Sequence, residues 1–301
     1  MTNNPKVYNF VVDKTGIRLD KYVGEKCPEL SRTHAQKLIA NGYVTVNDRT
    51  AKASVKLNID DRLTVTVPPP APSELTPEAI PLNIIYEDND LLVIDKPPGL
   101  TIHPAPGHLS HTLVNAILHY LPGLSDTGDP LRPGIVHRLD KDTSGVMLVA
   151  KNGVAQAKLS DQFKTHSVVK AYLALVQGHL MPDTGIIEAP IGRDPHNRKR
   201  MAVVTDGREA RTEYSVIKYI GNYTMLEVRP ETGRTHQIRV HLSAIGFPVA
   251  GDKVYGVKSP HLPRQFLHAC RLGFHLPSTG EYAEFESELP PDLEQALKNI
   301  A

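Results

Sequence analysis

The first part of the chain carries two short stretches of helical periodicity. From Leu19 to Cys27, apolar side chains recur at helical spacing, and Pro28 then ends the pattern because proline lacks a backbone N–H. A second helix is predicted to begin at Ser31, whose hydroxyl can cap an N-terminus. It should end at Gly42, because glycine tolerates the left-handed conformation that terminates helices. We therefore expect two adjacent helices near the N-terminus.

Strand-like alternation follows these helices. Residues 43–46 and 62–67 alternate apolar and polar side chains, as half-buried strands do, and the Asn47-Asp48-Arg49 segment between them favours a turn. Together the patterns predict that residues 14–67 form a small unit in which two helices pack on a sheet.

A proline-rich segment comes next. Prolines at 68–70 and 72, extended by Pro77 and Pro81, remove backbone donors and hold the chain near the polyproline II conformation. We interpret residues 68–81 as a semi-rigid linker to a larger unit at 82–301, which is long enough to bury a core of its own.

The larger unit contains apolar runs that are typical of buried strands. A strand-like run extends from Asn83 to Ile94, residues 146–150 are continuously apolar, and residues 171–175 repeat the pattern. These runs predict a sheet of several strands.

A helix is predicted after Arg234, because apolar side chains at 238, 242 and 245 fall at helical spacing, Thr235 can cap it and Gly246 can end it. Arg234 then lies at the helix entrance, where it can either reach a carboxylate in a neighbouring loop or remain a plain surface charge. His236 and His241 are the obvious candidates for a metal pair. They are five residues apart, whereas ligands on one helical face need a spacing of three or four, so no metal is expected.

The charge of the chain is nearly balanced overall but unevenly distributed. Its 34 Lys and Arg against 33 Asp and Glu give a net charge of +1, which excludes binding of polyanions through bulk charge alone. Residues 14–67 carry ten Lys or Arg against six Asp or Glu, a local net charge of +4. Arg32 and Lys37 lie off the apolar stripe of the second helix, where they can either meet phosphates or simply face solvent.

Neither export nor membrane insertion is indicated. Cys27 and Cys270 are the only cysteines, and their separation fits neither a disulfide scaffold nor a zinc ribbon. Residues 1–5 lack the basic and apolar parts of a signal peptide, and no stretch approaches the ~20 apolar residues that cross a bilayer. We expect a cytoplasmic protein without a membrane partner.

The most concentrated polar run of the larger unit lies at residues 134–145, between two apolar segments. This pattern is typical of a loop at the end of buried strands, where catalytic residues are often found. If the run is extended, Arg138 and Asp140 project to one side and His137 to the other. A cation beside a carboxylate favours the ionised form that a nucleophile or general base requires, although an Arg–Asp pair can also be purely structural.

A second basic cluster occupies residues 192–200 and contains Arg193 and Arg198. Pro195 and Asn197 favour a loop here. Such a loop can contact backbone phosphates, and the alternative is a solvated hairpin tip.

The N-terminal unit resembles an RNA-binding module named after a small-subunit ribosomal protein. That module carries an Arg-Leu-Asp start, a Ser-Arg helix entry and a Gly-Tyr-Val-Thr-Val-Asn hairpin, which are found here at residues 18–20, 31–32 and 42–47. The resemblance favours phosphate contacts over a merely solvated face for Arg32 and Lys37.

The larger unit resembles the large-subunit ribosomal RNA pseudouridine synthases, in particular type D. Residues 137–145, His-Arg-Leu-Asp-Lys-Asp-Thr-Ser-Gly, match the active-site signature of that family. Lys170-Ala171-Tyr172, Gly233–His241 and Gly251-Asp252 with Tyr255-Gly256 follow in the order that the family has. The resemblance covers nearly the whole chain and implies an α+β fold, with a mixed, mainly antiparallel sheet and flanking helices.

Carried over to this sequence, the resemblance implies Asp140 as the essential carboxylate, Tyr172 as a ring that packs against the target base, and Arg234 as the ion-pair partner of Asp140. Arg138 would fill the space left by the flipped nucleotide. The candidate RNA-binding residues are Arg138, His137, Lys170, Arg32, Lys37, Arg193 and Arg198.

The implied reaction is the isomerisation of uridine to pseudouridine in large-subunit ribosomal RNA. It needs no redox change and no energy input, so no cofactor is expected. A carboxylate can act as a nucleophile on C1′ or C6, or as a base on the ribose, and the sequence leaves these routes open. The expected partner is ribosomal RNA or a pre-ribosomal subunit, and the expected state is a monomer.

Two other functions remain open from the sequence. A non-catalytic RNA-binding or ribosome-assembly factor would keep the fold and use its groove only for docking. An Asp-dependent glycosidase would need a second carboxylate, for which Asp142 is the near neighbour.

Overall fold

The structure, a computed structural model, describes residues 5–27, 30, 32–68, 75–104, 110–124, 132–197, 200–256 and 262–300. The chain divides into two compact units, Met1–Ser73 and Glu74–Ala301. Residues 69–74 of the expected linker lie outside the described part. Within that part, no helix combines the length and the apolar character needed to span a membrane.

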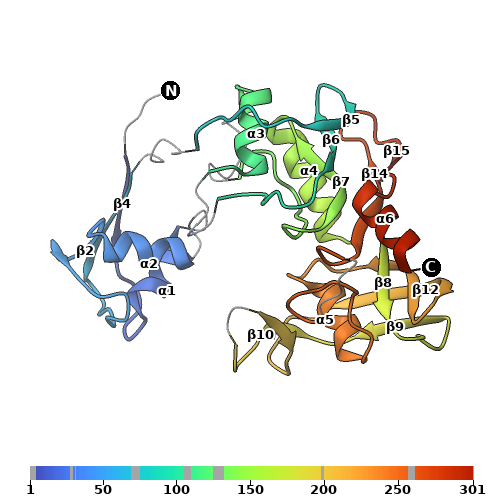
Figure 1. Cartoon of the computed structure of the whole chain (residues 1–301). Helices are drawn as coiled ribbons and strands as arrows, with labels where there is room; N and C mark the ends of the chain where they lie inside the picture. Colours follow the sequence, from blue (N-terminus) through green and yellow to red (C-terminus); the bar gives the residue numbers. More distant parts are fainter. Residues whose placement is uncertain are drawn as a thin grey trace. The chain divides into compact units, whose positions relative to one another are not determined.

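The first unit is a four-stranded sheet on which two helices pack (Figure 1). The strand order is β1-β4-β2-β3. The apolar stripes expected from the helical periodicity, such as Leu19 and Leu38, are buried together with Val44 and Val65 of the sheet. The elements are β1 (Lys6–Val11), α1 (Leu19–Lys26), α2 (Arg32–Ala40), β2 (Val44–Val46), β3 (Arg49–Thr50) and β4 (Arg62–Val67).

Strand β1 extends this unit beyond the expected boundary at residue 14. It pairs antiparallel with β4 over its whole length. Tyr8 and Phe10 pack on the core, whereas Val7 and Val11 are exposed. The strand has apolar side chains on both sides, so its position follows from its pairing with β4 rather than from its own pattern.

The second unit contains a nine-stranded sheet with the order β5-β6-β7-β14-β8-β13-β12-β9, and β15 pairs with β14. The pairing of β7 with β14 is parallel, and the other pairings described in this sheet are antiparallel. The fold is therefore α+β with a mixed, mainly antiparallel sheet, as expected. Its elements are β5 (Asn83–Glu87), β6 (Leu91–Lys96), α3 (Leu113–Tyr120), β7 (Ser144–Ala150), α4 (Gly153–Lys164), β8 (Val169–Gln177), β9 (Thr184–Glu188), the hairpin β10 (Ile191–Arg193) and β11 (Met201–Val203), β12 (Arg211–Ile220), β13 (Tyr223–Pro230), α5 (Gln237–Ala244), β14 (Leu267–His275), β15 (Tyr282–Glu286) and α6 (Pro291–Ile300).

Helices cover both faces of this sheet. Met147 and Val149 of β7 pack with α3, while Val146 and Leu148 pack with α4, because successive side chains of a strand point to opposite faces. Helices α5 and α6 cover opposite faces of β8 and β13 in the same way. Tyr172 contacts both the α3 cluster and the α5 cluster, so it lies where the two apolar clusters meet.

Two segments differ from the expected pattern. The run from Asn83 to Ile94 is a hairpin rather than one strand, because the Asp88 carboxylate accepts the N–H groups of Asp90 and Leu91 and closes a turn. The second half of the expected linker is packed rather than free. Leu75 belongs to the apolar core, and the N–H of Glu78 donates to a carbonyl of α3.

The central strands come close together where the site begins. All seven residues of β7 are buried. Gly145 has a φ of +117°, and a Cβ there would lie 2.1 Å from the carbonyl oxygen of Ala269 on β14. The loop that leads into β7 is therefore held against the middle of the sheet.

Candidate active site

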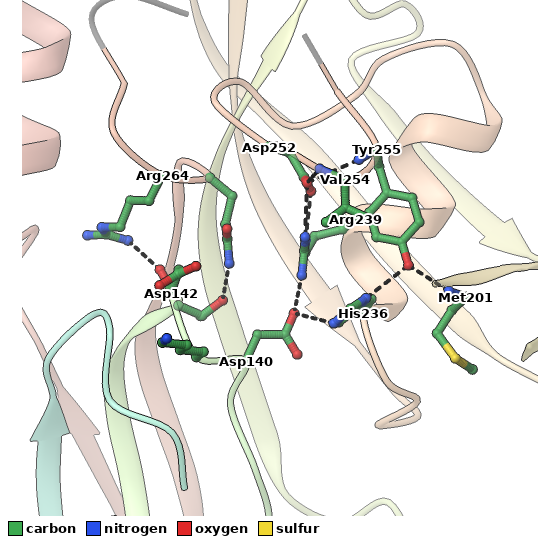
Figure 2. A network of polar contacts seen from close by, with 12 residues as sticks. Asp140, Asp142, Met201, His236, Arg239, Asp252, Val254, Tyr255 and Arg264 are labelled. Carbon is green, nitrogen blue, oxygen red and sulfur yellow. Dashed lines mark hydrogen bonds and ion pairs between the residues drawn. The ribbon is translucent and has the colours of Figure 1, made fainter. Parts of the chain in front are cut away.

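Asp140 lies in the loop that precedes β7, and two buried basic side chains, Lys96 and Arg264, hold this loop through its backbone. Lys96 at the end of β6 donates from Nζ to the carbonyl of Lys141 at 3.0 Å. Arg264 donates from Nη1 to the carbonyl of Asp142 at 3.0 Å (Figure 2). The peptide groups that follow Asp140 are thus fixed from two sides.

Both anchors have further partners. The Nζ of Lys96 also donates to the carbonyls of Pro97 and Leu100, and burial lowers the pKa of this lysine to about 7. The guanidinium of Arg264 forms a two-pronged ion pair with Asp292 of α6, at 2.7 and 3.0 Å. The Asp140 loop is therefore connected to elements that lie far apart in the sequence.

The ion-pair partner of Asp140 is Arg239. Its Nη1 lies 2.9 Å from Oδ2 of Asp140, while Nε and Nη2 bind both carboxylate oxygens of Asp252 at 2.6 and 2.9 Å. Figure 2 shows Arg239 between the two carboxylates. Because a guanidinium is a rigid planar fork, fixing it on Asp252 also fixes the third nitrogen that meets Asp140.

The charges in this triad stabilise one another. Burial alone would raise the pKa of Asp252, but its hydrogen bonds and ion pair with Arg239 outweigh burial and leave it lowered. Burial opposes the charge of Arg239 as well, yet the two carboxylates raise its pKa above the ordinary arginine value. Arg239 therefore remains a cation at the base of the site.

The assignment of this ion pair to Arg234 is wrong. Arg234 donates from Nε to the carbonyl of Glu209 at 2.9 Å, and its own N–H donates to Oε1 of Gln237. Thr235 does not cap α5 either, because the helix starts later, after His236 in a left-handed conformation. Starting at Gln237, the helix carries Arg239 in its first turn to Asp140.

His236 is a further polar group beside the carboxylate. Its Nε2 lies 3.9 Å from Oδ2 of Asp140, and its Nδ1 is 2.9 Å from the hydroxyl of Tyr255. The Tyr255 hydroxyl in turn accepts the N–H of Met201 on β11 at 2.8 Å (Figure 2). Tyr255 therefore connects the His236 ring to the β10–β11 hairpin. Burial lowers the pKa of His236, and the nearby Asp140 partly offsets this. The histidine is accordingly neutral near pH 7.

Tyr172 lines the same pocket as Asp140, on β8. Burial and, secondarily, the charge of Asp140 raise the pKa of its phenol. The ring therefore stays protonated and offers the pocket a flat uncharged face.

Two predicted RNA contacts also line this pocket. His137 accepts the N–H of Leu148 through Nε2 and stacks on Phe163, and burial lowers its pKa to about 3. It therefore contributes an uncharged ring. Lys170 donates from Nζ to the carbonyl of Glu231, and burial lowers its pKa to about 8, so it is still mainly charged at neutral pH.

The pocket has a volume of about 560 Å³, which is in the range of ligand sites in proteins. Among the described residues that line it, Asp140 is the only acid. The chain as a whole has a net charge of +1, so positive charge is concentrated at this pocket. Seven cations line it: Arg132, Arg138, Lys164, Lys170, Arg208, Arg234 and Arg239.

The remaining predicted residues are not among the described residues that line the pocket. Arg193 is exposed on β10 and does not line the pocket, and Arg198 lies outside the described residues. Lys37 is exposed on α2, while the Arg32 side chain is outside the described part. Asp142 contributes no lining side chain, so the second carboxylate that a glycosidase requires is missing from the described pocket wall.

His236 and His241 do not converge. His241 is buried between the hydroxyl of Thr212 and the carbonyl of Ala189, at 2.9 and 3.0 Å. Among the residues that the structure describes, no three His, Cys, Asp or Glu side chains are grouped so that they could hold a metal ion.

Four residues of the site were not predicted from the sequence, namely Arg239, Asp252, His236 and Tyr255. A signal was present, because all four belong to the segments 233–241 and 251–256 that carried the family resemblance. The segment 233–241 contains two arginines, and only the fold distinguishes which of them reaches Asp140.

Comparison with known proteins places this site in a family. Residues 90–244 match the RNA pseudouridylate synthase family, and residues 17–63 match the S4 domain. An uncharacterised RNA pseudouridine synthase of Bacillus subtilis is 46% identical over 94% of each chain. The ribosomal large subunit pseudouridine synthase D of Zymomonas mobilis is 43% identical, over 95% of this chain and 94% of its own.

A solved structure agrees with this. Human RNA pseudouridylate synthase domain containing 1 superposes with a TM-score of 0.60 at 31% identity, covering 73% of this chain and 89% of its own. The family match covers more than half of the chain, and the relatives are similar along almost its whole length. The chain therefore belongs to the RNA pseudouridine synthases, with an S4 domain ahead of its catalytic unit.

Proposed function

We propose that this RNA pseudouridine synthase isomerises uridines of large-subunit ribosomal RNA, and that Asp140 is the carboxylate that acts on the flipped-out nucleotide. The choice of RNA is supported by relatives from Zymomonas mobilis and Nitrosomonas europaea, both named ribosomal large subunit pseudouridine synthase D. The second is 44% identical over 95% of this chain.

The observation that carries the role of Asp140 is its isolation. It is the sole acid in a described pocket wall that holds seven Lys or Arg. Its ion pair with Arg239 uses Oδ2, and the neutral ring of His236 also lies nearest to this oxygen, at 3.9 Å. Among the residues that the structure describes, none is bonded to Oδ1, so this oxygen is left for a substrate. The positive wall suits a polyanion such as RNA.

The chemistry fits a single carboxylate. The bond between N1 and C1′ breaks, the uracil ring turns, and a bond between C5 and C1′ forms. C5 then loses its hydrogen and N1 gains one, so atoms and electrons balance without an oxidant or reductant. Asp140 would act either as a nucleophile or as a base on the ribose, and Arg239 holds its carboxylate ready for both.

The neighbouring residues have distinct proposed roles. Tyr172 offers its ring to the target base, a stacking contact worth ~1–3 kcal/mol. Arg138, which is exposed beside Asp140, would enter the gap that the flipped nucleotide leaves. The S4 domain, through Arg32 and Lys37, would add phosphate contacts of its own. The protein would act as a monomer in the cytoplasm, where ribosomal RNA is assembled into subunits.

The test of Asp140 uses the hydrogen that C5 must lose. Ribosomal RNA transcripts carrying tritium at C5 of uridine release it when pseudouridine forms. The wild type and Asp142→Asn, whose side chain is outside the pocket, should release tritium, and Asp140→Asn should not. Release by Asp140→Asn at the wild-type rate would refute the role of this carboxylate.

The choice of RNA needs a separate test. Mapping of pseudouridines in a strain that lacks the gene should show missing positions in large-subunit ribosomal RNA. If the missing positions lie only in transfer or small-subunit ribosomal RNA, the proposed substrate is wrong even though the chemistry is right.

A further inference from the structure

One wall of the pocket carries two neighbouring arginines whose role is not explained by the triad of Asp140, Arg239 and Asp252. Arg208 lies in the connection between β11 and β12, and Arg234 lies just before α5. Both line the pocket. In the described part of the structure, neither guanidinium forms an ion pair with a carboxylate within 4.0 Å.

The backbone under both arginines is rigid. Arg208 exchanges two hydrogen bonds of 2.9 Å with Ile191, through its N–H and its carbonyl. The residue before it, Gly207, approaches the Ile191 backbone so closely that a Cβ would lie 2.7 Å from it. The turn at Arg234 is closed by Gln237, whose Oε1 accepts the Arg234 N–H and whose own N–H donates to the Arg234 carbonyl.

The guanidinium of Arg234 is also oriented. Its Nε donates to the carbonyl of Glu209, the residue next to Arg208. This bond leaves the two Nη nitrogens for an external acceptor, in the planar arrangement that matches two oxygens of a phosphate.

The two cations repel each other in the absence of an anion. Burial lowers the pKa of Arg234, the charge of Arg208 lowers it further, and the exposed Glu209 only partly offsets these effects. An anion bound between the two guanidiniums would remove this repulsion and replace the lost hydration.

We propose that Arg208 and Arg234 form a clamp for one backbone phosphate of the RNA, adjacent to the uridine that enters the pocket. This inference rests on the proposed function, because it assumes a polynucleotide substrate whose target base reaches Asp140. The clamp fixes the position of the strand beside Asp140, and Lys164 and Lys170 on another part of the pocket wall remain for other phosphates.

The experiment removes either the positive charge of an arginine, by substitution with glutamine, or the negative charge of one phosphate, by replacement with a methylphosphonate. A short RNA with one uridine that the wild type isomerises is made with a methylphosphonate, which is uncharged, at one backbone position at a time near that uridine. Its dissociation constant is measured for the wild type, Arg208→Gln, Arg234→Gln, the double variant, and the control Arg229→Gln. Arg229 lies on β13 outside the pocket.

On unmodified RNA each single Gln variant should bind roughly tenfold more weakly, and the dependence of log Kd on log salt should fall by about 0.7 for the lost contact. The double variant should lose less than the product of the two single losses, because both arginines hold the same phosphate. Arg229→Gln should bind like the wild type.

One methylphosphonate position should weaken the wild type and make it indistinguishable from both Gln variants on that RNA. Arg234→Lys, which keeps the charge but not the fork, should retain the salt dependence while losing part of the affinity. Melting temperatures equal to that of the wild type exclude unfolding as the cause.

The proposal is overturned if the variants stay weaker than the wild type on every methylphosphonate RNA, or if they bind unmodified RNA as tightly as it does. The proposed function is read separately, from tritium release by the wild type on unmodified RNA. If release occurs and no position couples to the arginines, only the clamp is wrong. If the wild type releases no tritium from any ribosomal RNA, the proposed function itself fails.

Discussion

Replacing Arg239 by lysine tests whether a shared guanidinium holds Asp140 in place. Arg239 makes three charge-assisted hydrogen bonds, two of them to Asp252 and one to Asp140. An ammonium is a single centre and cannot bridge both carboxylates. Asp252 is wholly buried and also accepts the N–H groups of Val254 and Tyr255, so it should keep the ammonium. Asp140 would then lose its partner.

The size of the effect follows from the lost contact. A hydrogen bond between charged groups contributes about 1.5–3 kcal/mol, which corresponds to a loss in kcat of about 10- to 150-fold. The positive charge remains in the variant, so the Kd for RNA should change little, whereas the loss of contacts within this buried ion-pair network should lower the melting temperature. Single-turnover tritium release at saturating enzyme measures the rate, and a separate titration with RNA measures the Kd.

The matched control is Arg271→Lys. Arg271 on β14 also lies between two carboxylates, those of Glu227 and Glu284, but it is outside the pocket. This control should react at the wild-type rate. If folded Arg239→Lys also reacts within about threefold of the wild type, or loses only RNA affinity, Arg239 does not position Asp140 for the reaction.

Three further changes test other parts of the site. Lys170, whose pKa burial lowers to about 8, is protonated below that pH, so its contribution to RNA affinity should be present at pH 7 and lost as the pH rises through about 8. Lys170→Met should abolish this part of the pH dependence. The charge-matched control is Lys164→Met, because Lys164 is exposed. If the affinity of Lys170→Met followed the same pH profile as that of the wild type, the role of Lys170 would be contradicted. Arg138→Ala should slow action on folded RNA more than on an unstructured oligonucleotide, and equal losses would mean that the arginine does not fill the gap left by a flipped base. Lys96→Met would leave three carbonyls without their donor. It should therefore lower the free energy of unfolding, measured by urea denaturation, by about 2–5 kcal/mol. A loss below about 1 kcal/mol would show that the loop does not depend on this anchor.

Helices and strands that follow from the periodicity of residues close together in the sequence were predictable. The apolar stripe from Leu19 to Cys27 and the alternation at residues 62–67 determine α1 and β4, because periodicity reports directly which side chains are buried. The strand β7 follows from its continuous apolar run for the same reason. Strand β1 was missed, since its pairing with β4 joins segments that are far apart in the chain.

Candidate site residues were predictable where a sequence motif contains one residue of the required type, and not where it contains two. Asp140 and Tyr172, the residues that the motifs single out, both line the pocket, and their roles in the reaction stay predictions. The segment 233–241 contains both Arg234 and Arg239, and the choice between them depends on where α5 begins. A left-handed residue at His236 delays the helix and turns Arg239 to the carboxylate, which no local pattern reveals.

The most direct test of the central claim returns the gene to a strain that lacks it. Pseudouridines are mapped in large-subunit ribosomal RNA after complementation with the wild type, Asp142→Asn or Asp140→Asn, all expressed at equal levels. We expect the first two to restore every missing position, and Asp140→Asn to restore none while still binding the RNA. Full restoration by Asp140→Asn would contradict it, because the reaction would then proceed without the carboxylate on which the site is built.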